Sequence, residues 1–298
     1  MPKKTRIPRV SILVPFQGDD AAFEETLVSV LEHQPAGCEV VVAHNGTYTD
    51  PFELGDEVKF AVARSSNLVD LIRDGFEATR SQFVHILAPG LVADSDWISE
   101  ALEPFERSHI ASVVPAVINV DGRRQIAGWK DTPGLLGKTV RDDNDSIGGG
   151  FLDAVLYRRR ILGGLLGSVA AAIVDEMEVG YAFGCLLQFA GWETAIAPQS
   201  ILHRTRRPEF GTASSEERGK RLAAIRDTIL PDAEPLRVTS LIREGLFGAS
   251  SVAEMLGTLR YRSELAGVAR MIDLEALPGF DTDSGVLRAT TISDRAAA

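Results

Sequence analysis

The sequence predicts an α/β protein with a mostly parallel central sheet, helices on both faces of that sheet, and a helical extension at the C-terminus. Three features carry this prediction. In the first hundred residues, short apolar runs of strand length alternate with longer segments of helical periodicity. The apolar runs end at turn-forming residues such as Pro, Gly and Asn, and from residue 218 onward only helical periodicity remains. Strands that alternate with helices favour parallel pairing with right-handed crossovers.

The first part of the chain supplies the predicted parallel strands. These strands are residues 9–15, 39–43, 58–63 and 83–87. The predicted helices of this part are residues 22–33 and 68–80. A third helix, capped by Asp94 or Ser95, carries the apolar residues Trp97, Ile98 and Leu102. The turn Ala88-Pro89-Gly90 follows the run at 83–87. Ligands of open α/β sheets bind beyond the carboxyl ends of the strands, so this turn stands at a natural binding-site position.

The second part of the chain has weaker periodicity. Strands are predicted at residues 110–120, 151–157, 192–197 and 200–203, a long loop at 123–150, one helix at 168–191, and a polar loop at 204–217. We expect a first domain at residues 1–217 and a C-terminal helical region with a frayed tail at residues 218–298.

Charge and composition exclude several classes of partner. The formal net charge is -11 at pH 7 and the pI is about 5.0, which argues against nucleic acid or an anionic membrane surface as the main partner. No apolar stretch is long enough for a membrane span, and Cys38 and Cys185 are the only cysteines. We therefore expect a cytoplasmic protein without a disulfide framework.

Several segments follow one another in a characteristic order. They are VSILVPFQGDDAAFEETLVSVL, EVVVAHNGTYTD, RDGFEATRSQFVHILAPGLVADSDWISEAL and FAGWETAIAPQSILHR. Together they resemble the family 2 glycosyltransferases over residues 10–205, from the opening strand and proline to the closing strand and histidine. The resemblance implies the GT-A fold, a nucleoside-diphosphate sugar as donor, and transfer of the sugar to an unknown acceptor.

The chain departs from the family pattern at residues that carry chemistry. In the family, the two aspartates of a DxD motif hold a divalent cation on the sugar diphosphate, and these positions correspond to Ala88 and Gly90. Neither side chain can ligate a hard cation. We therefore predict no metal ligand and no required cofactor, with Mg or Mn involved only if the family chemistry is retained. Asp94 and Asp96 spell a literal DxD, but they match a helix-capping stretch.

The family's catalytic base falls on Val179 and Gly180, which carry no carboxylate. Asp175 and Glu176 lie four residues earlier, so one extra helical turn would return them to the pocket. An inverting transferase needs a carboxylate within hydrogen-bond reach of the acceptor hydroxyl. We assign this role to Asp175 or Glu176; the alternative is a solvated face at the start of a helix.

A compact cationic loop follows His203 in this acidic chain. Its residues are Arg204, Arg206 and Arg207, and guanidinium groups pair bidentately with phosphate oxygens. Such a loop could neutralise a leaving diphosphate without a cation; the alternative is a solvated basic loop. The nucleotide-binding candidates that the resemblance implies are Pro15, Phe16, His44, Asn45, Asn67, Arg73, Ala88, Gly90, His203, Arg204 and Arg206.

Two residues of the long loop are candidates for acceptor binding. Trp129 offers an aromatic face on which a sugar could stack. Gly149 belongs to a run of glycines that resembles the family's approach to the acceptor pocket.

Two functions follow from these observations. One is sugar transfer from a nucleoside-diphosphate sugar by a divergent enzyme that is metal-independent or impaired. The other is a fold that has lost catalysis and binds a nucleotide, a sugar or another protein. Under either, we expect no nucleic acid and no membrane span, and the C-terminal helices are candidates for a homo-oligomer contact.

Overall fold

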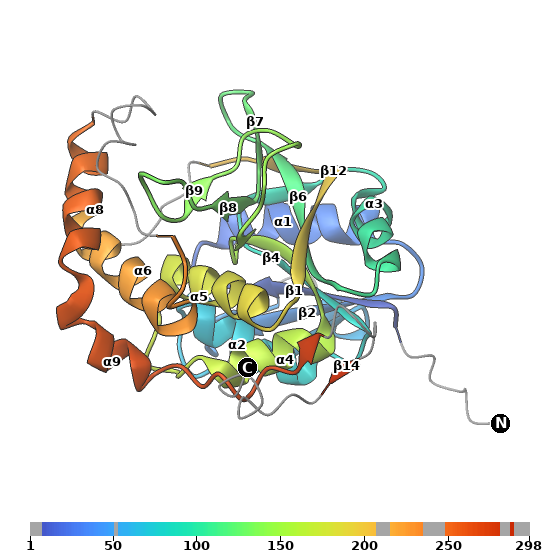
Figure 1. Cartoon of the computed structure of the whole chain (residues 1–298). Coiled ribbons are helices and arrows are strands. Elements are labelled where there is room, and N and C mark those ends of the chain that lie inside the picture. The colour runs from blue at the N-terminus through green and yellow to red at the C-terminus, as the bar shows by residue number, and fades with distance from the viewer. Residues whose placement is uncertain (1–7, 51–52, 207–214, 235–247, 281–286, 289–298) are drawn as a thin grey trace.

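The computed structural model describes residues 8–50, 53–206, 215–234, 248–280 and 287–288 (Figure 1). A twisted central sheet runs through the molecule, with the strands in the order β3-β2-β1-β4-β11-β6-β12-β5 and β7 paired to β6. Helices α1 and α3 lie on one face of the sheet, and α2 and α4 lie on the other (Figure 1). The predicted α/β class is confirmed.

The elements have the following bounds. The strands are β1 (Val10–Pro15), β2 (Cys38–His44), β3 (Val58–Val62), β4 (Phe83–Leu87), β5 (Leu91–Ala93), β6 (Ile110–Ile118), β7 (Arg124–Ile126), β8 (Gly128–Lys130), β9 (Lys138–Thr139), β10 (Gly149–Gly150), β11 (Ala154–Arg158), β12 (Glu193–Arg204), β13 (Gly279–Phe280) and β14 (Leu287–Arg288). The α-helices are α1 (Asp20–His33), α2 (Leu68–Ala78), α3 (Trp97–Leu102), α4 (Arg159–Ser168), α5 (Glu176–Phe189), α6 (Ser215–Ile229), α8 (Ala249–Leu259) and α9 (Leu265–Ala269). Short 3-10 helices lie at Leu54–Asp56, Glu103–Glu106 and Tyr261–Ser263.

The first half of the sheet is parallel, as predicted. β1 pairs in parallel with β2 and β4, and β2 pairs in parallel with β3. Beyond β4 the sheet is mixed, because β11 inserts antiparallel between β4 and β6, while β12 runs parallel to β6. The carboxyl ends of β1, β2, β4 and β12 therefore meet at one edge of the sheet.

Three predicted elements differ in detail. The predicted loop at 123–150 contains β7 and a small sheet of β8, β9 and β10. The strands predicted at 192–197 and 200–203 form one strand, β12, whose register shifts between Ala197 and Ile201, around Pro198. Proline has no N–H for the ladder, so an irregularity there is expected. The helix predicted at 168–191 begins only at Glu176, because residues 169–175 form a separate connection after α4.

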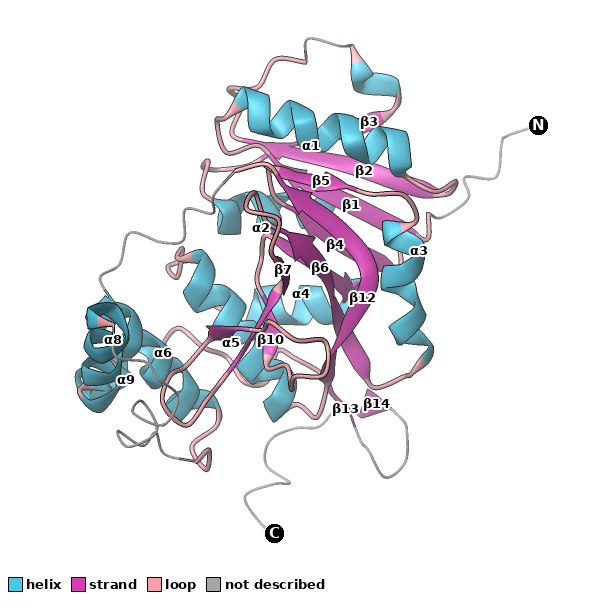
Figure 2. Ribbon diagram, turned by 90° about the horizontal axis from the view of Figure 1, so that it is seen from above, coloured by secondary structure: helices cyan, strands magenta, loops and turns pink. Residues whose placement is uncertain are grey.

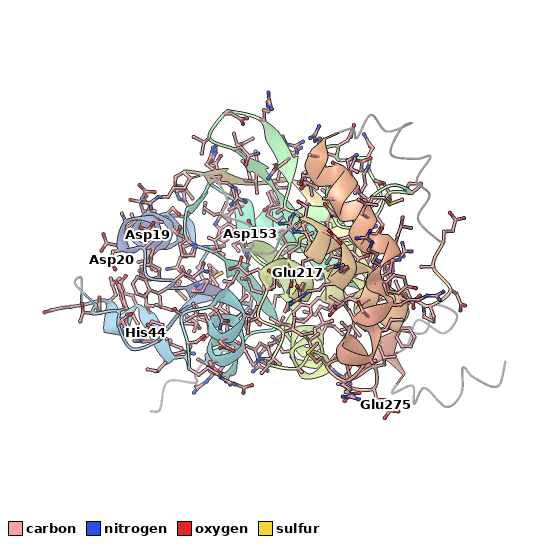
Figure 3. The ribbon with its side chains drawn as sticks, turned by 90° about the vertical axis from the view of Figure 1, so that its left-hand side faces the viewer. Asp19, Asp20, His44, Asp153, Glu217 and Glu275 are labelled. Atoms are coloured by element: carbon pink, nitrogen blue, oxygen red, sulfur yellow. The ribbon has the colours of Figure 1, made fainter. Side chains whose placement is uncertain are left out.

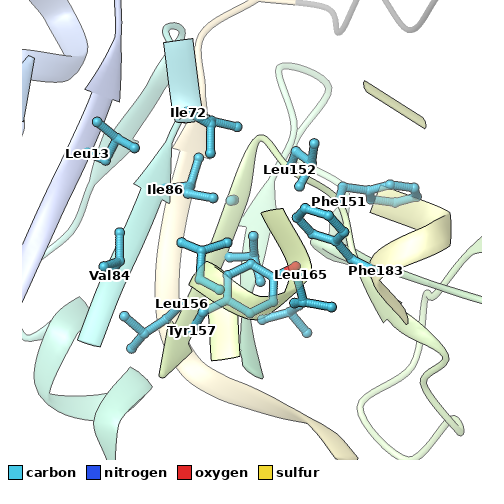
Figure 4. Packing of buried hydrophobic residues seen from close by; sticks show 14 of the residues in the cluster. Leu13, Ile72, Val84, Ile86, Phe151, Leu152, Leu156, Tyr157, Leu165 and Phe183 are labelled. Atoms are coloured by element: carbon cyan, nitrogen blue, oxygen red, sulfur yellow. The ribbon is translucent and has the colours of Figure 1, made fainter. Parts of the chain in front are cut away.

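The hydrophobic core joins the two halves of the sheet to α4 and α5 (Figure 4). Leu13 of β1, Ile86 of β4, Leu156 of β11 and Leu165 of α4 are fully buried. Helix α5 is buried from Glu178 to Leu187. This burial fixes the N-terminus of α5 beside the strand ends.

The C-terminal helices α6, α8 and α9 lie together at one side of the molecule (Figures 1 and 2). Sequence periodicity predicted no strand beyond residue 218, whereas the structure has the short pair β13–β14. Residues 235–247 of the predicted C-terminal helical region and most of the predicted frayed tail lie outside the described residues. No helix in the described part of the chain has the length and apolar character to cross a membrane.

Candidate functional site

Polar residues from several elements converge where the strands end. The Ala88 N–H donates to the Asp153 carbonyl at 2.8 Å, which joins the end of β4 to the start of β11. The Thr205 N–H donates to the Gly90 carbonyl at 2.9 Å, which joins β12 to the same turn. We call the residues gathered here (15–17, 88–90, 153, 175–176 and 204–206) the strand-end site.

The turn after β4 is built from backbone contacts. Gly90 has a φ of +83°, a conformation that favours glycine, and its N–H is shared between the Ala22 carbonyl and Thr26 Oγ1 of α1. Ala88 is 6% exposed. Both predicted nucleotide-binding positions therefore lie in the strand-end site, and they contribute backbone there.

The cationic residues at the end of β12 and just after it are paired with carboxylates. Arg204 Nη2 donates to Asp153 Oδ2 at 2.6 Å, and both side chains are about nine-tenths buried, at 8% and 10% exposed. Arg206 forms an ion pair with Asp19, the N-cap residue of α1 (Figure 3 labels Asp19 and Asp153). Arg207 lies outside the described residues. The loop therefore holds its cations against the strand ends.

Asp153 was not predicted as a site residue. It lies within the apolar run FLDAVLY, which the sequence analysis assigns to a strand, and the structure starts β11 one residue later, at Ala154. A charged residue inside a buried apolar run needs a partner, and that signal was available in the sequence.

Asp175 and Glu176 have different roles. Asp175 is the N-cap of α5, and its Oδ1 accepts the Glu178 N–H at 3.0 Å. The Glu176 carboxylate accepts from Gln17 Nε2 at 3.3 Å, which brings it to the end of β1. Burial, together with the negative charges of Asp153 and Asp175, raises the pKa of Glu176 from 4.5 to about 7. A carboxyl group with a pKa near neutrality suits general acid–base chemistry.

Glu178 lies outside this cluster although it shares the same helical turn. It is 5% exposed and pairs with Arg221 of α6 at 3.1 Å. Burial raises the pKa of Glu178 to about 7, and the Arg221 charge opposes that shift. Its role is to tie α5 to α6.

His203 points away from Arg204, because successive side chains of a strand alternate between its faces. It is half exposed, and its Nε2 lies 3.5 Å from Asp94 Oδ2 at the start of the connection to α3. The structure therefore does not bring the predicted His203 together with the Asp153–Arg204 pair.

The ends of β1 and β2 carry an aromatic cluster. Phe16 is 3% exposed and packs against Tyr48 at 5.0 Å between ring centroids, and the His44 ring contacts the same tyrosine at 6.2 Å. His44 Nδ1 accepts the Gly46 N–H, and burial lowers the pKa of His44. Pro15 is buried at the end of β1, and Asn45 is occupied with Thr47 in the following turn.

Two further nucleotide-binding predictions fall on side chains that the fold uses itself. Asn67 is the N-cap of α2, where its side-chain oxygen accepts the Asp70 N–H. The Arg73 guanidinium donates to the carbonyls of Leu166 and Val169 at the end of α4. The structure gives both residues structural roles.

The acceptor-binding prediction for Trp129 and Gly149 is corrected by the structure. Trp129 is 1% exposed, stacks on Tyr181 at 4.4 Å, and donates from its indole N–H to the Gly180 carbonyl. Gly148, Gly149 and Gly184 pack so closely against the ring that a Cβ at any of them would overlap it. The glycines form a slot for a core tryptophan, so its face is closed to a sugar.

The described residues of the strand-end site do not form a cation site of the usual kind. Hard divalent cations take several oxygen ligands, and Ala88 and Gly90 offer no side-chain oxygen at the turn. In the described ranges, no group of three or more His, Cys, Asp or Glu side chains is arranged to hold a metal ion.

No protein-family model matches the sequence, and no curated protein sequence matches it either. Solved glycosyltransferase structures are similar in fold. The structure of GalNAc-T7 with UDP, GalNAc and Mn2+ matches with a TM-score of 0.54 and 14% identity, over 92% of this chain and 59% of that chain. The mannosyltransferase PcManGT from Pyrobaculum calidifontis, in complex with GDP-Man and Mn2+, matches with a TM-score of 0.53 and 14% identity, over 91% of this chain and 78% of that chain.

A bacterial structure gives a similar match. Residues 1–349 of S. aureus TarS match with a TM-score of 0.52 and 14% identity, over 87% of this chain and 74% of that chain. This chain thus spans 59% of the length of the GalNAc-T7 structure and about three quarters of the other two. Identities this low compare backbone architecture, and on that basis the chain has the fold of the GT-A glycosyltransferases.

Proposed function

We propose that the chain is a glycosyltransferase that moves a sugar from a nucleoside-diphosphate sugar to a hydroxyl group of an acceptor. The observation that carries the proposal is that Asp153 connects Arg204 and Glu176 at the strand-end site: it pairs with the Arg204 guanidinium, and its charge acts on the Glu176 carboxylate. Glu176 is a carboxylate with a pKa near neutrality, and Arg204 is a buried guanidinium next to the turn after β4. Sugar transfer from a diphosphate needs both a proton acceptor and a cation for the leaving group.

The residues divide the work as follows. Glu176 takes the proton of the acceptor hydroxyl as that oxygen bonds to the anomeric carbon of the sugar. The bond from the anomeric carbon to the diphosphate oxygen breaks, and the diphosphate leaves with its electron pair. Arg204 and Arg206 offset the negative charge that develops there, because guanidinium groups bind phosphate oxygens in a bidentate geometry. Phe16 and His44, at the ends of β1 and β2, lie where the nucleoside would bind.

We propose that these steps need no divalent cation. Ala88 and Gly90 supply only backbone at the position where the family carries its metal ligands, and the arginines provide the positive charge instead. GalNAc-T7 and the mannosyltransferase were solved with Mn2+. A role for Mg or Mn in this chain would therefore need ligands other than these two positions.

A second candidate is a module that binds a nucleotide or a sugar without turnover. It is favoured by two ion pairs, Arg204 with Asp153 and Arg206 with Asp19. These pairs offset the positive charge of both arginines with carboxylates of the protein itself. Three points stay predictions under either candidate function. They are the identity of the acceptor, a cytoplasmic location, and a homo-oligomer formed through the C-terminal helices.

Calorimetric titration with UDP, GDP, UDP-GlcNAc and GDP-mannose, with and without manganese, tests the proposal. We expect binding without manganese, and we expect the Arg204→Ala/Arg206→Ala variant to lose about tenfold or more in affinity. Arg64→Ala is the matched control, because Arg64 also pairs with an aspartate, Asp74, but lies outside the strand-end site. Absence of binding by every nucleotide would reject the proposal.

Release of the nucleoside diphosphate separates the two candidates. An enzyme should release UDP or GDP from at least one sugar nucleotide, and Glu176→Gln should stop that release while nucleotide binding persists. Binding without any release in the unmodified protein would favour the binding module.

A further inference from the structure

Asp153 occupies the junction of the strand-end site. It immediately precedes β11, and its backbone carbonyl accepts the Ala88 N–H at 2.8 Å. Its carboxylate is 10% exposed; Oδ2 accepts from Arg204 Nη2, and the buried Oδ1 has no hydrogen-bond partner among the described residues. A buried carboxylate oxygen without a partner is costly, so its retention calls for an explanation.

The first consequence concerns Arg204. Its side chain is 8% exposed, and a buried guanidinium is stable only beside a compensating charge. Asp153 supplies that charge to Nη2, whereas Nε is buried without a partner. No hydrogen bond joins Nη1 to the residues that the structure describes, so this nitrogen remains available to a ligand oxygen. Asp153 therefore fixes the guanidinium and leaves one edge of it free.

The second consequence concerns Glu176. The charged groups that act on it are Asp153 before β11 and Asp175 at the N-cap, and the polar group that contacts it is Gln17 after β1. After burial, the negative charge of Asp153 is the largest cause that raises the pKa of Glu176. Asp153 is thus linked both to the cation and to the carboxylate of the proposed reaction.

We propose that Asp153 is a positioning residue, which holds the Arg204 guanidinium beside the Ala88–Gly90 turn for a phosphate oxygen of the nucleotide and keeps Glu176 ready to accept a proton. The inference rests on the proposed function, and it adds a residue that neither the sequence pattern nor the fold comparison assigns. Asp153 acts through its two neighbours and makes no bond to the reacting atoms.

Carboxyl-carbon NMR titration of Glu176 tests one half of the inference and needs no substrate. In Asp153→Asn the amide oxygen can still accept from Arg204, but the negative charge is gone. We expect the titration midpoint of Glu176 to fall by at least about half a pH unit, because a nearby like charge raises a carboxyl pKa. Asp74→Asn is the control. Asp74 lies on α2 and also pairs with an arginine, Arg64, but it is not among the groups that shift the pKa of Glu176. An unmoved midpoint in Asp153→Asn would overturn this half.

Calorimetric titration with UDP and GDP tests the other half. Asp153→Ser places its hydroxyl too far back to reach Arg204, and we expect it to bind about tenfold more weakly than Asp153→Asn. Equal affinities in the two variants would overturn the role in holding Arg204. Circular dichroism shows whether Asp153→Ser folds. If it does not fold, Asp153→Asn is compared with the unmodified protein instead. A nucleotide affinity within about threefold supports the role of Asp153 in holding Arg204, and a loss as large as that of Arg204→Ala contradicts that role. If no protein binds a nucleotide, the proposed function fails, and the NMR midpoint still decides the link between Asp153 and Glu176.

Discussion

Glu176 ionises at a cost in folding free energy. The pKa of an unfolded glutamate is 4.5, and burial followed by the charge of Asp153 raises it to about 7 in the fold. Below pH 4.5 such a carboxyl group is protonated in both the folded and the unfolded state, so its raised pKa does not lower the free energy of unfolding. Above pH 7 it is ionised in both states, and the free energy of unfolding is lowered by the full amount. Deprotonation between these two values is therefore the step that destabilises the fold.

Glu176→Gln should remove this penalty. We expect the variant to be more stable than the unmodified protein at pH 8 by on the order of 1–3 kcal/mol, since one pKa unit corresponds to about 1.4 kcal/mol. The difference should vanish below pH 4.5. Urea unfolding at both pH values measures it, with Glu103→Gln as the control at an exposed position. A gain of equal size at both pH values would contradict the argument.

The slot around Trp129 is a second residue-scale feature. A Cβ on Gly184 would overlap the indole ring and would approach the Gly148 carbonyl to 2.7 Å. We expect Gly184→Ala to destabilise the fold by about 1–3 kcal/mol despite the better helix propensity of alanine. Gly167→Ala is the control, because its Cβ would meet Ala276 at an ordinary 3.7 Å and should stabilise α4 by roughly 0.5 kcal/mol. Thermal unfolding of both variants decides whether the slot is as tight as described.

At this scale the sequence predicted local chemistry better than long-range contacts. Glu176 was a candidate because it lies one helical turn before the base position that the resemblance implies, and Arg204 because it belongs to a cationic run after His203. The structure brings both to the strand-end site, and their roles stay predictions. Trp129 was misassigned because its slot is made by glycines of β10 and α5, which no local pattern connects to it. Asp153 was missed because its arginine partner lies 51 residues along the chain.

Helix α5 carries the element-scale argument. Periodicity merged residues 168–191 into one helix, although Asp175 followed three residues later by Glu178 is a usable start signal. The structure begins α5 at Glu176 with Asp175 as its cap, and this start directs Glu176 to Gln17. The position of the helix start thus decides which of the two adjacent carboxylates caps α5 and which one lies beside Gln17.

Substitution of the cap tests this assignment. Asp175→Ala should destabilise the protein by about 1 kcal/mol, whereas Asp175→Ser, which can also cap, should cost only a few tenths. Equilibrium unfolding measures the difference. If Asp175 were the catalytic base instead, Asp175→Ser would abolish release of the nucleoside diphosphate while remaining folded; we expect that release to persist.

At the scale of the whole molecule, the parallel half of the sheet was predictable and the mixed half was not. β1 and β2 are each followed by a connection that leads to a neighbouring strand, and α2 carries the chain from β3 across to β4 on the other side of β1, so alternating strand and helix periodicity predicts parallel pairing here. β11 reaches its place between β4 and β6 after the segment with β7, β8, β9 and β10, and its direction depends on pairing across the fold. Nothing in the apolar run at 151–157 specifies that direction.

The C-terminal region also returns to the core. Phe280 of β13 is 8% exposed, its N–H donates to the Ala190 carbonyl at 2.7 Å, and its ring packs on Trp192 at 4.9 Å. The Trp192 indole N–H donates to the Pro278 carbonyl. β13 and the residues just before it are therefore packed against the connection between α5 and β12.

Removing this contact should weaken the whole fold in one step. We expect Phe280→Ala to lower the free energy of unfolding by about 3 kcal/mol, as large-to-small changes at buried aromatic positions do. Far-UV circular dichroism and tryptophan fluorescence should report the same lowered midpoint, because the C-terminal region and the sheet share one core. Val62→Ala, at a position 72% exposed, is the control and should change stability by less than about 0.5 kcal/mol. Two separate transitions in Phe280→Ala would show instead that the C-terminal region folds apart from the sheet.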